Sequence, residues 1–214
     1  MPISSNKYKQ MSIKEFTKAA KIYDSGKSGI YEMCKYDYPK VLKELKNKKF
    51  KDVLDCGCGT GPMIEILCEK YPDKQYTGLD LTPEMIKKAK EKNLSNTKFI
   101  VGDCENLPFE DESFDMIICT NSFHHYPNPQ DFLDNVYRVL RKGGRLILRD
   151  YTSSDVVVWL MNHIELPLAH LVGHGDVKIY KKEEYREMLK KAGFRKMKVQ
   201  KEEKFRCHAV AVKL

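Results

Sequence analysis

The residues best suited to chemistry lie early in the chain, in the glycine-rich stretch Asp55–Gly61. The apolar run from Phe50 to Cys56 predicts a short buried strand that ends in this stretch, and Pro62 suits the first turn of a helix. Glycines at alternate positions let the backbone bend sharply and approach a ligand without a Cβ in the way. The pattern is typical of nucleotide sites, although tight strand-to-helix turns also use glycine for packing alone.

An acidic residue follows at a suitable distance. Gln75 to Leu79 is predicted to be a second strand, and it ends in Asp80, about twenty residues beyond Gly61. In nucleotide-binding βαβ units, an acidic residue at that place accepts hydrogen bonds from ribose hydroxyls. The other role for Asp80 is to cap the next helix, and Thr82, just before Pro83, fills that role better. We therefore expect Asp80 to face a ligand.

Two more strands end in polar residues. Thr97 to Val101 is predicted to lead into Gly102-Asp103-Cys104, and the apolar run Phe114–Thr120 leads into Asn121–Tyr126. The carboxyl ends of parallel strands meet at one edge of the sheet, where ligands bind in open α/β folds. An ionised Asp103 only accepts hydrogen bonds, which suits an amine donor and not a phosphate. Its other possible role is to form the turn before Glu105.

These segments, in this order, resemble the class I S-adenosylmethionine-dependent methyltransferases, in particular the small-molecule type related to quinone-biosynthesis methyltransferases. The resemblance covers roughly residues 50 to 150 and is carried by Val53–Gly61, Tyr76–Asp80, Val101–Cys104, Phe114–His125 and Leu140–Leu146. It implies S-adenosyl-L-methionine as cofactor, S-adenosyl-L-homocysteine as product, and transfer of a methyl group to an O, N, S or C atom of a small-molecule acceptor. The identity of the acceptor stays open.

The resemblance also implies which residues bind the cofactor. In similar proteins, the acidic residue after the third strand binds the adenine amine, and the loop after the fourth strand supports the methionine part. The cofactor-binding residues expected on this basis are Tyr23, Asp55, Gly57, Gly59, Thr60, Gly61, Asp80, Leu81, Met85, Gly102, Asp103, Cys104, Asn121 and Ser122.

No catalytic group stands out, and the chemistry explains why. A sulfonium donor is already activated, so the protein has to align the reactants, and it needs a base only when the acceptor must lose a proton. The candidates are His125, Asp150 and His163, with Tyr151 as a possible acceptor contact. His125 could instead shape its loop, and His163 could be a satisfied core residue. Adjacent histidines with no evident carboxylate partner do not indicate a metal site.

The surrounding elements predict an α/β fold with a doubly wound, seven-stranded, mostly parallel sheet, the Rossmann-like methyltransferase fold. We expect a single domain over residues 1–214. Its three parts are a helical N-terminal cap (1–47), a cofactor-binding half (48–150), and substrate-side helices with a terminal β-hairpin (151–214). The antiparallel strand is expected at the edge of the sheet.

Local signals set several boundaries. Ser12-Ile13-Lys14-Glu15 is typical of a capping box at the start of a helix. A helix is expected from Pro129 to Arg141, closed by Gly143-Gly144 and followed by a strand over 145–148. Phe16, Tyr23 and Tyr31 could form a lid over the cofactor and acceptor or pack against the sheet.

Composition narrows the function classes. The net charge of +8 comes mostly from lysines interleaved with glutamates at helical spacing, which indicates solvated helix faces more than a nucleic-acid surface. No run of eighteen apolar residues exists, so no membrane partner is expected. The seven cysteines follow no disulfide or metal spacing, and we expect a cytoplasmic protein. The sequence does not indicate an oligomeric state.

Alternatives from other classes stay open. An RNA-directed methyltransferase or a non-catalytic cofactor-binding protein would share the cofactor motif. A nicotinamide-dependent oxidoreductase would share Gly57, Gly59, Gly61 and Asp80, but it does not account for Asp103-Cys104 or for Gly143-Gly144.

Overall fold

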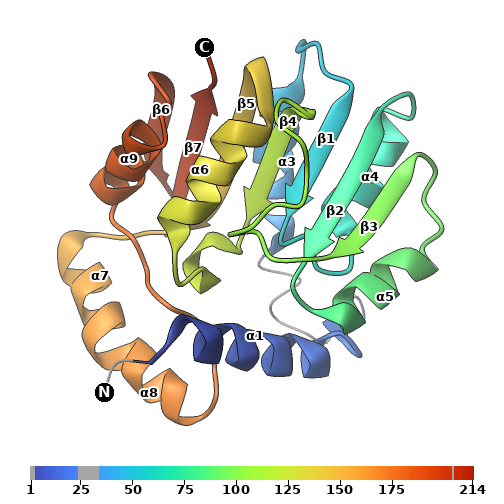
Figure 1. Cartoon of the computed structure of the whole chain (residues 1–214). Helices are drawn as coiled ribbons and strands as arrows, with labels where there is room; N and C mark the ends of the chain where they lie inside the picture. The colour runs from blue at the N-terminus through green and yellow to red at the C-terminus, as the bar shows by residue number, and fades with distance from the viewer. Residues whose placement is uncertain (1–2, 24–33, 204) are drawn as a thin grey trace.

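The computed structural model of the chain describes residues 3–23, 34–203 and 205–214. Seven strands form one sheet in the order β3-β2-β1-β4-β5-β7-β6 (Figure 1). The strands are β1 Asp52–Cys56, β2 Gln75–Asp80, β3 Thr97–Val101, β4 Phe114–Thr120, β5 Leu140–Tyr151, β6 Lys196–Glu202 and β7 Arg206–Val212. All neighbouring pairs from β3 to β5 are parallel, and β7 is antiparallel to both β5 and β6. The doubly wound, mostly parallel sheet expected from the sequence is confirmed.

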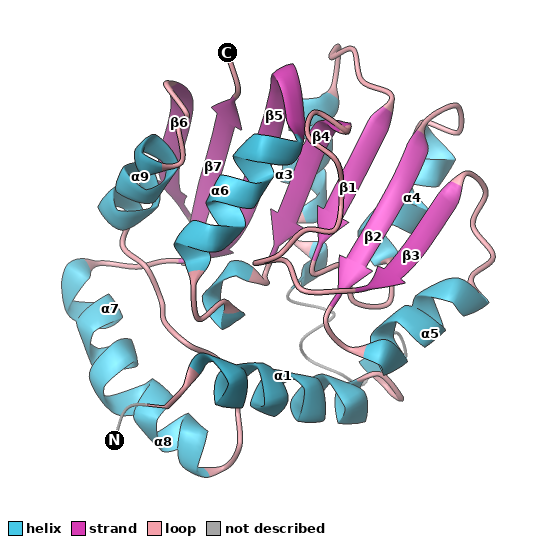
Figure 2. Cartoon of the chain, in the orientation of Figure 1, coloured by secondary structure: helices cyan, strands magenta, loops and turns pink. Residues whose placement is uncertain are grey.

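Helices cover both faces of the sheet (Figure 2). They are α1 Ser5–Ala19, α3 Tyr38–Leu45, α4 Pro62–Lys70, α5 Pro83–Glu91, α6 Pro129–Val139, α7 Asp155–Leu160, α8 Leu166–Leu171 and α9 Lys182–Lys191. A short 3-10 helix, η2, spans Phe123–His125, and a π-helical segment, η3, spans Met161–Glu165 and joins α7 to α8. A proline opens each of α4, α5 and α6, where its missing N–H leaves no hydrogen bond unmade.

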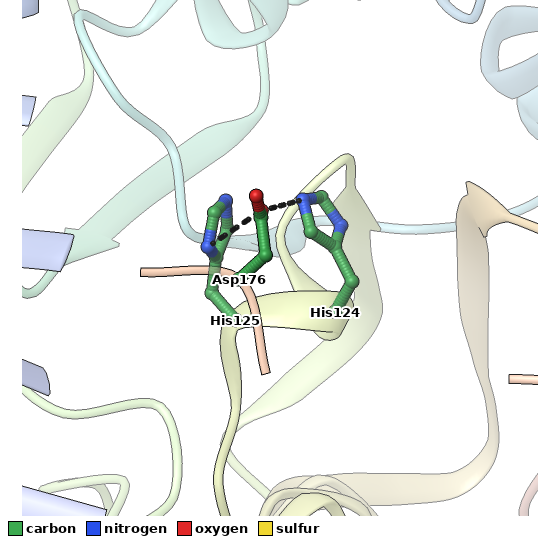
Figure 3. A group of neighbouring side chains, drawn as sticks. All are labelled: His124, His125 and Asp176. Carbon is green, nitrogen blue, oxygen red and sulfur yellow. Dashed lines mark ion pairs between the residues drawn. The ribbon is translucent and has the colours of Figure 1, made fainter. Parts of the chain in front are cut away.

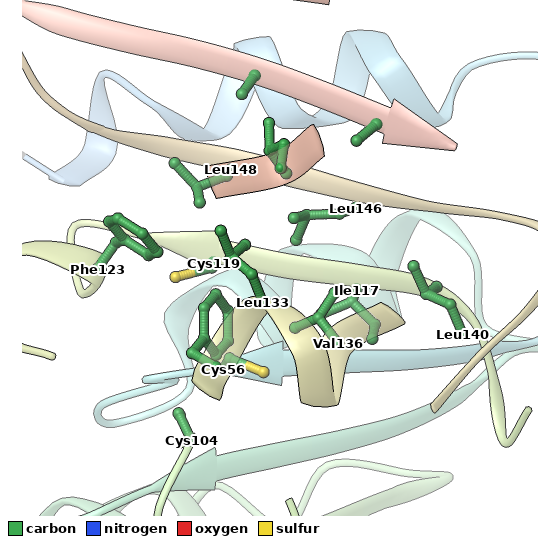
Figure 4. Packing of buried hydrophobic residues seen from close by; sticks show 14 of the residues in the cluster. Cys56, Cys104, Ile117, Cys119, Phe123, Leu133, Val136, Leu140, Leu146 and Leu148 are labelled. Atoms are coloured by element: carbon green, nitrogen blue, oxygen red, sulfur yellow. The ribbon is translucent and has the colours of Figure 1, made fainter. Parts of the chain in front are cut away.

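Alternate side chains of the central strands pack into two separate hydrophobic cores, one on each face of the sheet. Ile117 and Cys119 of β4 pack with α6 and α9 on one face (Figure 4). Met116 and Ile118 of the same strand pack with α3, α4 and α5 on the other. Strand side chains alternate between faces, so a strand buried on both sides reads as a continuous apolar run.

Three local expectations are wrong. The antiparallel strand β7 is not at the edge, because it lies between β5 and β6. The helix opened by Pro129 ends at Val139, and Leu140 already pairs with Phe114 at the start of β5. Ser12 does not begin a helix: α1 starts at Ser5 with Ser4 as N-cap, and the buried Ser12 hydroxyl donates to the carbonyl oxygen of Gly175.

Candidate active site

The glycine turn after β1 is fastened to the end of β2. The N–H groups of Gly57 and Cys58 donate to the carbonyl oxygen of Leu79 at 2.8 and 3.1 Å. The Gly59 N–H donates to Oδ2 of Asp80 at 2.9 Å, and the Thr82 N–H donates to Oδ1 at 2.8 Å. Asp80 therefore holds the glycine turn with one oxygen and the start of α5 with the other, a role that the sequence did not reveal. Each carboxylate oxygen keeps a second lone pair, so ligand hydroxyls can still bind there.

Gly57 brings the loops after β1 and β4 into direct contact. Its φ of +72° lies in the left-handed region. A Cβ at this position would lie 2.0 Å from Oγ of Ser122, so no other residue fits without moving the β4 loop. Oγ of Ser122 is in turn 2.8 Å from the hydroxyl of Tyr126.

Two acidic side chains lie at the ends of β1 and β2: Asp55 is buried and Asp80 is partly buried. Asp55 is 2% exposed, and burial together with the charge of Asp80 raises the pKa of its carboxyl to about 7. Burial also raises the pKa of Asp80, while the N–H groups of Thr82 and Gly59 oppose that change. Such a pair favours hydroxyl or ammonium donors and disfavours a phosphate at this position.

A cavity of about 60 Å³ lies over the turn. Seven of the predicted residues line it: Gly57, Asp80, Leu81, Asp103, Cys104, Ser122 and His125. Lys9, Ser12 and Phe16 of α1 form its outer wall. Sites for ligands of drug size measure about 300 Å³ or more, so this cavity is smaller than a whole cofactor requires.

Lys9 makes a contact that the sequence did not predict. Its Nζ lies 2.6 Å from Oδ2 of Asp103 and also pairs with Glu105. The lysine therefore uses the carboxylate that was expected to receive the adenine amine. The two residues are 94 positions apart, and no local pattern connects them.

The other predicted cofactor residues do not line this cavity: Tyr23, Asp55, Gly59, Thr60, Gly61, Met85, Gly102 and Asn121. The ring of Tyr23 lies 4.0 Å from the Cβ position of Gly59 and so covers the turn. Thr60 and Met85 are each 1% exposed, and Met85 packs with Ala20 and Tyr23. Tyr31 lies outside the described residues.

Asn121 directly follows β4 and has a left-handed conformation, with φ of 51°. Its Nδ2 donates to Oδ2 of Asp37 at 2.7 Å. Its Oδ1 is buried and has no hydrogen-bond partner among the described residues. A buried acceptor without a donor costs free energy, so this oxygen is well suited to receive an N–H of a ligand.

Asp37 is the centre of a buried charge network that the sequence also did not predict. It is completely buried and accepts hydrogen bonds from Nε of Arg149 at 2.9 Å and from Nε of Arg206 at 3.1 Å. Arg149 donates a second bond to Oε2 of Glu202 at 2.9 Å. The guanidinium of Arg206 lies over the ring of Tyr151, 4.2 Å from its centroid. Mutual pairing is what permits these charges to be buried.

This network forms one wall of a second, larger cavity of about 890 Å³. Its lining combines charged residues with apolar side chains: Tyr36, Asp37, Lys40, Arg149, Tyr151, Thr152, Val157, Met161, Glu165, Lys201, Glu202, Glu203, Phe205 and Arg206. Asn121 contacts the wall of this cavity through Asp37, and the next residue, Ser122, lines the smaller one. The end of β4 therefore lies between the two cavities.

The paired histidines on η2 belong to a compact cluster (Figure 3). Nδ1 of His124 is 2.6 Å from Oδ1 of Asp150, and its Nε2 is 3.2 Å from Oδ1 of Asp176. Nδ1 of His125 is 3.4 Å from the same Asp176 oxygen. The expectation that no carboxylate lies near these histidines is therefore wrong.

The two histidines have opposite electrostatic environments. Burial alone would lower the pKa of His124, but the charge of Asp150 and the bonds to Asp150 and Asp176 raise it to about 10. Burial and the positive charge of His124 lower the pKa of His125 to about 4. At neutral pH, His124 is charged and donates to both carboxylates, and His125 is neutral. A cation at this cluster would have to displace the His124 proton.

This environment predicts a pH dependence of stability. Because folding raises the pKa of His124 from 6.5 to about 10, its stabilising contribution is complete below pH 6.5 and is lost as pH rises to about 10. We expect the free energy of unfolding to fall across this window in the wild type and to fall less in His124→Gln. Urea titrations at several pH values measure this. His174→Gln, at a half-exposed histidine, is the control and should follow the wild type; parallel curves for wild type and His124→Gln would contradict the assignment.

The structure separates the three catalytic candidates. His125 lines the smaller cavity. Asp150 is completely buried, and its carboxylate already accepts hydrogen bonds from His124 and from the Tyr151 N–H. His163 is exposed, stacks on Trp159, and places Nδ1 2.8 Å from the Trp159 carbonyl oxygen, so it is not the satisfied core residue that the sequence suggested.

Comparison with known proteins agrees with this geometry. Residues 54–148 match a family model described as a methyltransferase domain. The chain is 41% identical over 130 residues to phthiotriol/phenolphthiotriol dimycocerosates methyltransferase 1 of Mycobacterium ulcerans, covering 60% of this chain and 47% of that protein. It is 36% identical over 123 residues to a fatty-acid O-methyltransferase of Mycolicibacterium smegmatis, covering 56% and 45%. The chain thus spans about half the length of these relatives.

A solved structure reproduces the fold over nearly the whole chain. It is a chain of the Haloferax volcanii complex that contains the Trm112 methyltransferase activator, with a TM-score of 0.75 and 22% identity. The superposition covers 92% of this chain and 97% of that one. That likeness shows the fold. The matched domain and the methyltransferases to which the chain is similar show that residues 54–148 form a class I S-adenosylmethionine-dependent methyltransferase domain, whose cofactor is S-adenosyl-L-methionine.

Proposed function

We propose that this protein transfers the methyl group of S-adenosylmethionine to a carboxylate oxygen of a small acid with an apolar body. The observation that carries the proposal is the pair of cavities on either side of the β4 end. The smaller one holds the donor after α1 shifts, and the larger one holds the acceptor. The Asn121-Ser122 segment lies between them, where donor and acceptor have to meet.

On the donor side, three polar groups of the cofactor have a complementary residue. Asp80 accepts the ribose hydroxyls, and Asp103 accepts the adenine amine in place of Lys9. The unpartnered Oδ1 of Asn121 accepts a hydrogen bond from the ammonium of the methionine part. The glycine turn leaves room for the backbone to approach the ligand closely.

On the acceptor side, charge and apolar surface are arranged for an amphipathic acid. Arg149 and Arg206 lie in the inner wall of the larger cavity, and guanidinium groups bind carboxylates well. Val157 and Met161 contribute apolar surface to the same cavity. The Mycolicibacterium smegmatis relative is named a fatty-acid O-methyltransferase, which is consistent with an acceptor of this chemistry.

The chemistry needs little beyond alignment. The cofactor supplies an activated methyl group: its S–C bond breaks as an O–C bond forms, and the sulfonium charge and the carboxylate charge are both lost. Alignment of the two reactants can lower the barrier by several kcal/mol. A carboxylate has no proton to lose. This fits the environment of His125, whose pKa of about 4 makes it a weak base.

The test is to follow S-adenosylhomocysteine formation with three acceptors that share one medium-length alkyl chain: a carboxylic acid, an alcohol and an amine. We expect the acid to be methylated fastest, with a methyl ester as product. The alcohol and the amine serve as matched controls, since they occupy the same apolar volume without the charge.

Each other outcome is informative. Methylation of the alcohol or amine with an inert acid would overturn the carboxylate assignment and retain a small-molecule methyltransferase. Label transferred to RNA, with no turnover of any small acceptor, would support the RNA-directed alternative. Cofactor binding without turnover on either would support a non-catalytic role.

A further inference from the structure

A stripe of large apolar side chains is exposed along the helix formed by α7, η3 and α8. We call Val156, Trp159, Leu160, Ile164, Leu168, Leu171 and Val172 the apolar stripe. Their exposed fractions run from 42% at Leu160 to 82% at Leu171. Exposed apolar residues are ordinary when scattered, but a contiguous set on one element marks an interaction surface.

The π-helical turn η3 keeps this stripe on one side of the helix. Positions four apart drift around a regular α-helix, and the wider π turn at Met161–Glu165 offsets that drift. The carbonyl oxygen of Trp159 receives a hydrogen bond from His163, whose ring stacks on the indole at 4.7 Å between centroids. The exposed indole is thus held in one orientation.

Positive charges are absent from the segment that carries the apolar stripe and are exposed on the neighbouring helix α1. No Lys or Arg occurs between Tyr151 and Val177, in a chain that has 38 of them. The neighbouring helix α1 presents exposed Lys7, Lys14 and Lys18 at spacings of seven and four. These three lie on the helix face opposite Lys9, Ser12 and Phe16, which line the smaller cavity, so the lysine row points away from the sheet.

Helix α1, which carries the lysine row, contacts α8 and the loop that follows it. The ring of Tyr8 packs edge-on against His170 with centroids 5.2 Å apart. Glu15 accepts bonds from His174 and from the Gly175 N–H at 2.7 and 2.9 Å. Figure 1 shows α1, α7 and α8 together beyond the carboxyl ends of the strands.

The stripe is also continuous with the larger cavity. Val157 and Met161, on the inner side of the same helix, line that cavity. Tyr36 and Phe205, 63% and 62% exposed, belong to its lining as well. Apolar surface therefore extends from the outside of the helix to the mouth of the cavity.

We propose that the apolar stripe and the α1 lysine row dock this protein on the surface of an anionic lipid membrane. An apolar helix face inserted at the headgroup boundary, with lysines beside it, is the arrangement by which peripheral helices bind such surfaces. The described helices include none that is long and apolar enough to cross a membrane. Docking in this orientation places the helix that walls the larger cavity against the lipid, and, if the proposed function holds, brings that cavity close to a source of amphipathic acceptor.

The chain carries its own reporter for this proposal. Trp159 is its single tryptophan, and it lies on the stripe. We expect its fluorescence emission to shift to shorter wavelength when vesicles of phosphatidylcholine and phosphatidylglycerol are added. Co-sedimentation with the same vesicles should rise with the phosphatidylglycerol fraction and fall with salt. Neither measurement needs cofactor or acceptor, so its outcome is independent of the proposed function.

Substitutions that leave Trp159 in place test each part of the surface. Leu168→Ser combined with Leu171→Ser should weaken vesicle binding by about tenfold or more, since each leucine loses its apolar contact with lipid. Replacing Lys7, Lys14 and Lys18 by glutamine should weaken binding to anionic vesicles by roughly fivefold per residue and leave neutral vesicles unaffected. Val101→Ser, at a 48% exposed valine on β3, is the matched control and should bind as the wild type does.

Two results would overturn the proposal. One is unchanged Trp159 emission and no sedimentation at any lipid composition, with circular dichroism showing a folded protein. The other is a dimer in light scattering that Leu168→Ser with Leu171→Ser dissociates, because the stripe would then be covered by a second copy of the chain.

Discussion

Replacing Asp37 by asparagine is expected to lower the free energy of unfolding by about 3–5 kcal/mol. The substitution keeps the shape of the side chain but removes the charge that Arg149 and Arg206 share. Arg149 keeps its ion pair with Glu202. The loss of stability therefore comes mainly from leaving two buried guanidinium groups with a single carboxylate to neutralise them. For a domain of this size, the loss corresponds to a drop of about 6–20 °C in Tm. Urea unfolding followed by circular dichroism measures it directly.

The matched control is Asp111→Asn. Asp111 pairs with Arg138 at 2.9 Å, but its side chain is 74% exposed, so water replaces the lost partner. That variant should change stability by no more than about 1 kcal/mol. If both variants unfolded at the same urea concentration, the buried network would not stabilise the fold as its geometry indicates.

The second large effect is expected at Asp80, where alanine should weaken binding of S-adenosylhomocysteine by roughly ten- to a hundredfold. Charge-assisted hydrogen bonds contribute about 1.5–3 kcal/mol each, and 1.4 kcal/mol is a factor of ten in affinity. The structure adds a second reason, because Asp80 also holds the N–H groups of Gly59 and Thr82. Calorimetric titration of the folded variant measures the change.

Asp80→Asn separates the two roles. Its remaining carbonyl oxygen can still accept one backbone N–H, but it has lost the charge that binds hydroxyls strongly. We expect it to bind more weakly than the wild type and more strongly than alanine. Asp73→Ala, at a 72% exposed position before β2, is the control and should bind normally. A loss below threefold in a folded Asp80→Ala would show that this carboxylate does not hold the ribose.

The part of the fold that the sequence predicted well is the part governed by local signals. Apolar runs followed by glycine, aspartate or asparagine located β1 to β4, since each signal lies within a few residues of the strand it ends. Gly143-Gly144 was misread as a helix cap. The glycines instead sit where β5 changes register against β4, between the Leu140 and Arg145 pairings. Composition alone does not distinguish these two uses of glycine.

The contacts that the sequence did not predict join distant positions. Asp37 meets Arg149 and Arg206 across 112 and 169 residues, and Lys9 meets Asp103 across 94. Each partner lies in a segment whose own pattern is ordinary for a helix or a strand. Only the strand order, which brings β5, β7 and the start of α3 to one edge, makes them neighbours. The acidic residues at strand ends were predictable because that edge is shared by every parallel strand.

The position of the two cavities on opposite sides of the β4 end has a consequence for how such proteins diverge. In the proposed arrangement, the donor cavity is lined by α1, by the glycine turn and the ends of β2 and β3, and by residues 122–127. The acceptor wall is assembled from segments near residues 36–40, 149–165 and 201–206. Substitutions in those segments can accumulate in a lineage without touching the donor residues. A gene encoding this fold can therefore acquire new substrates while inheriting its methyl donor unchanged.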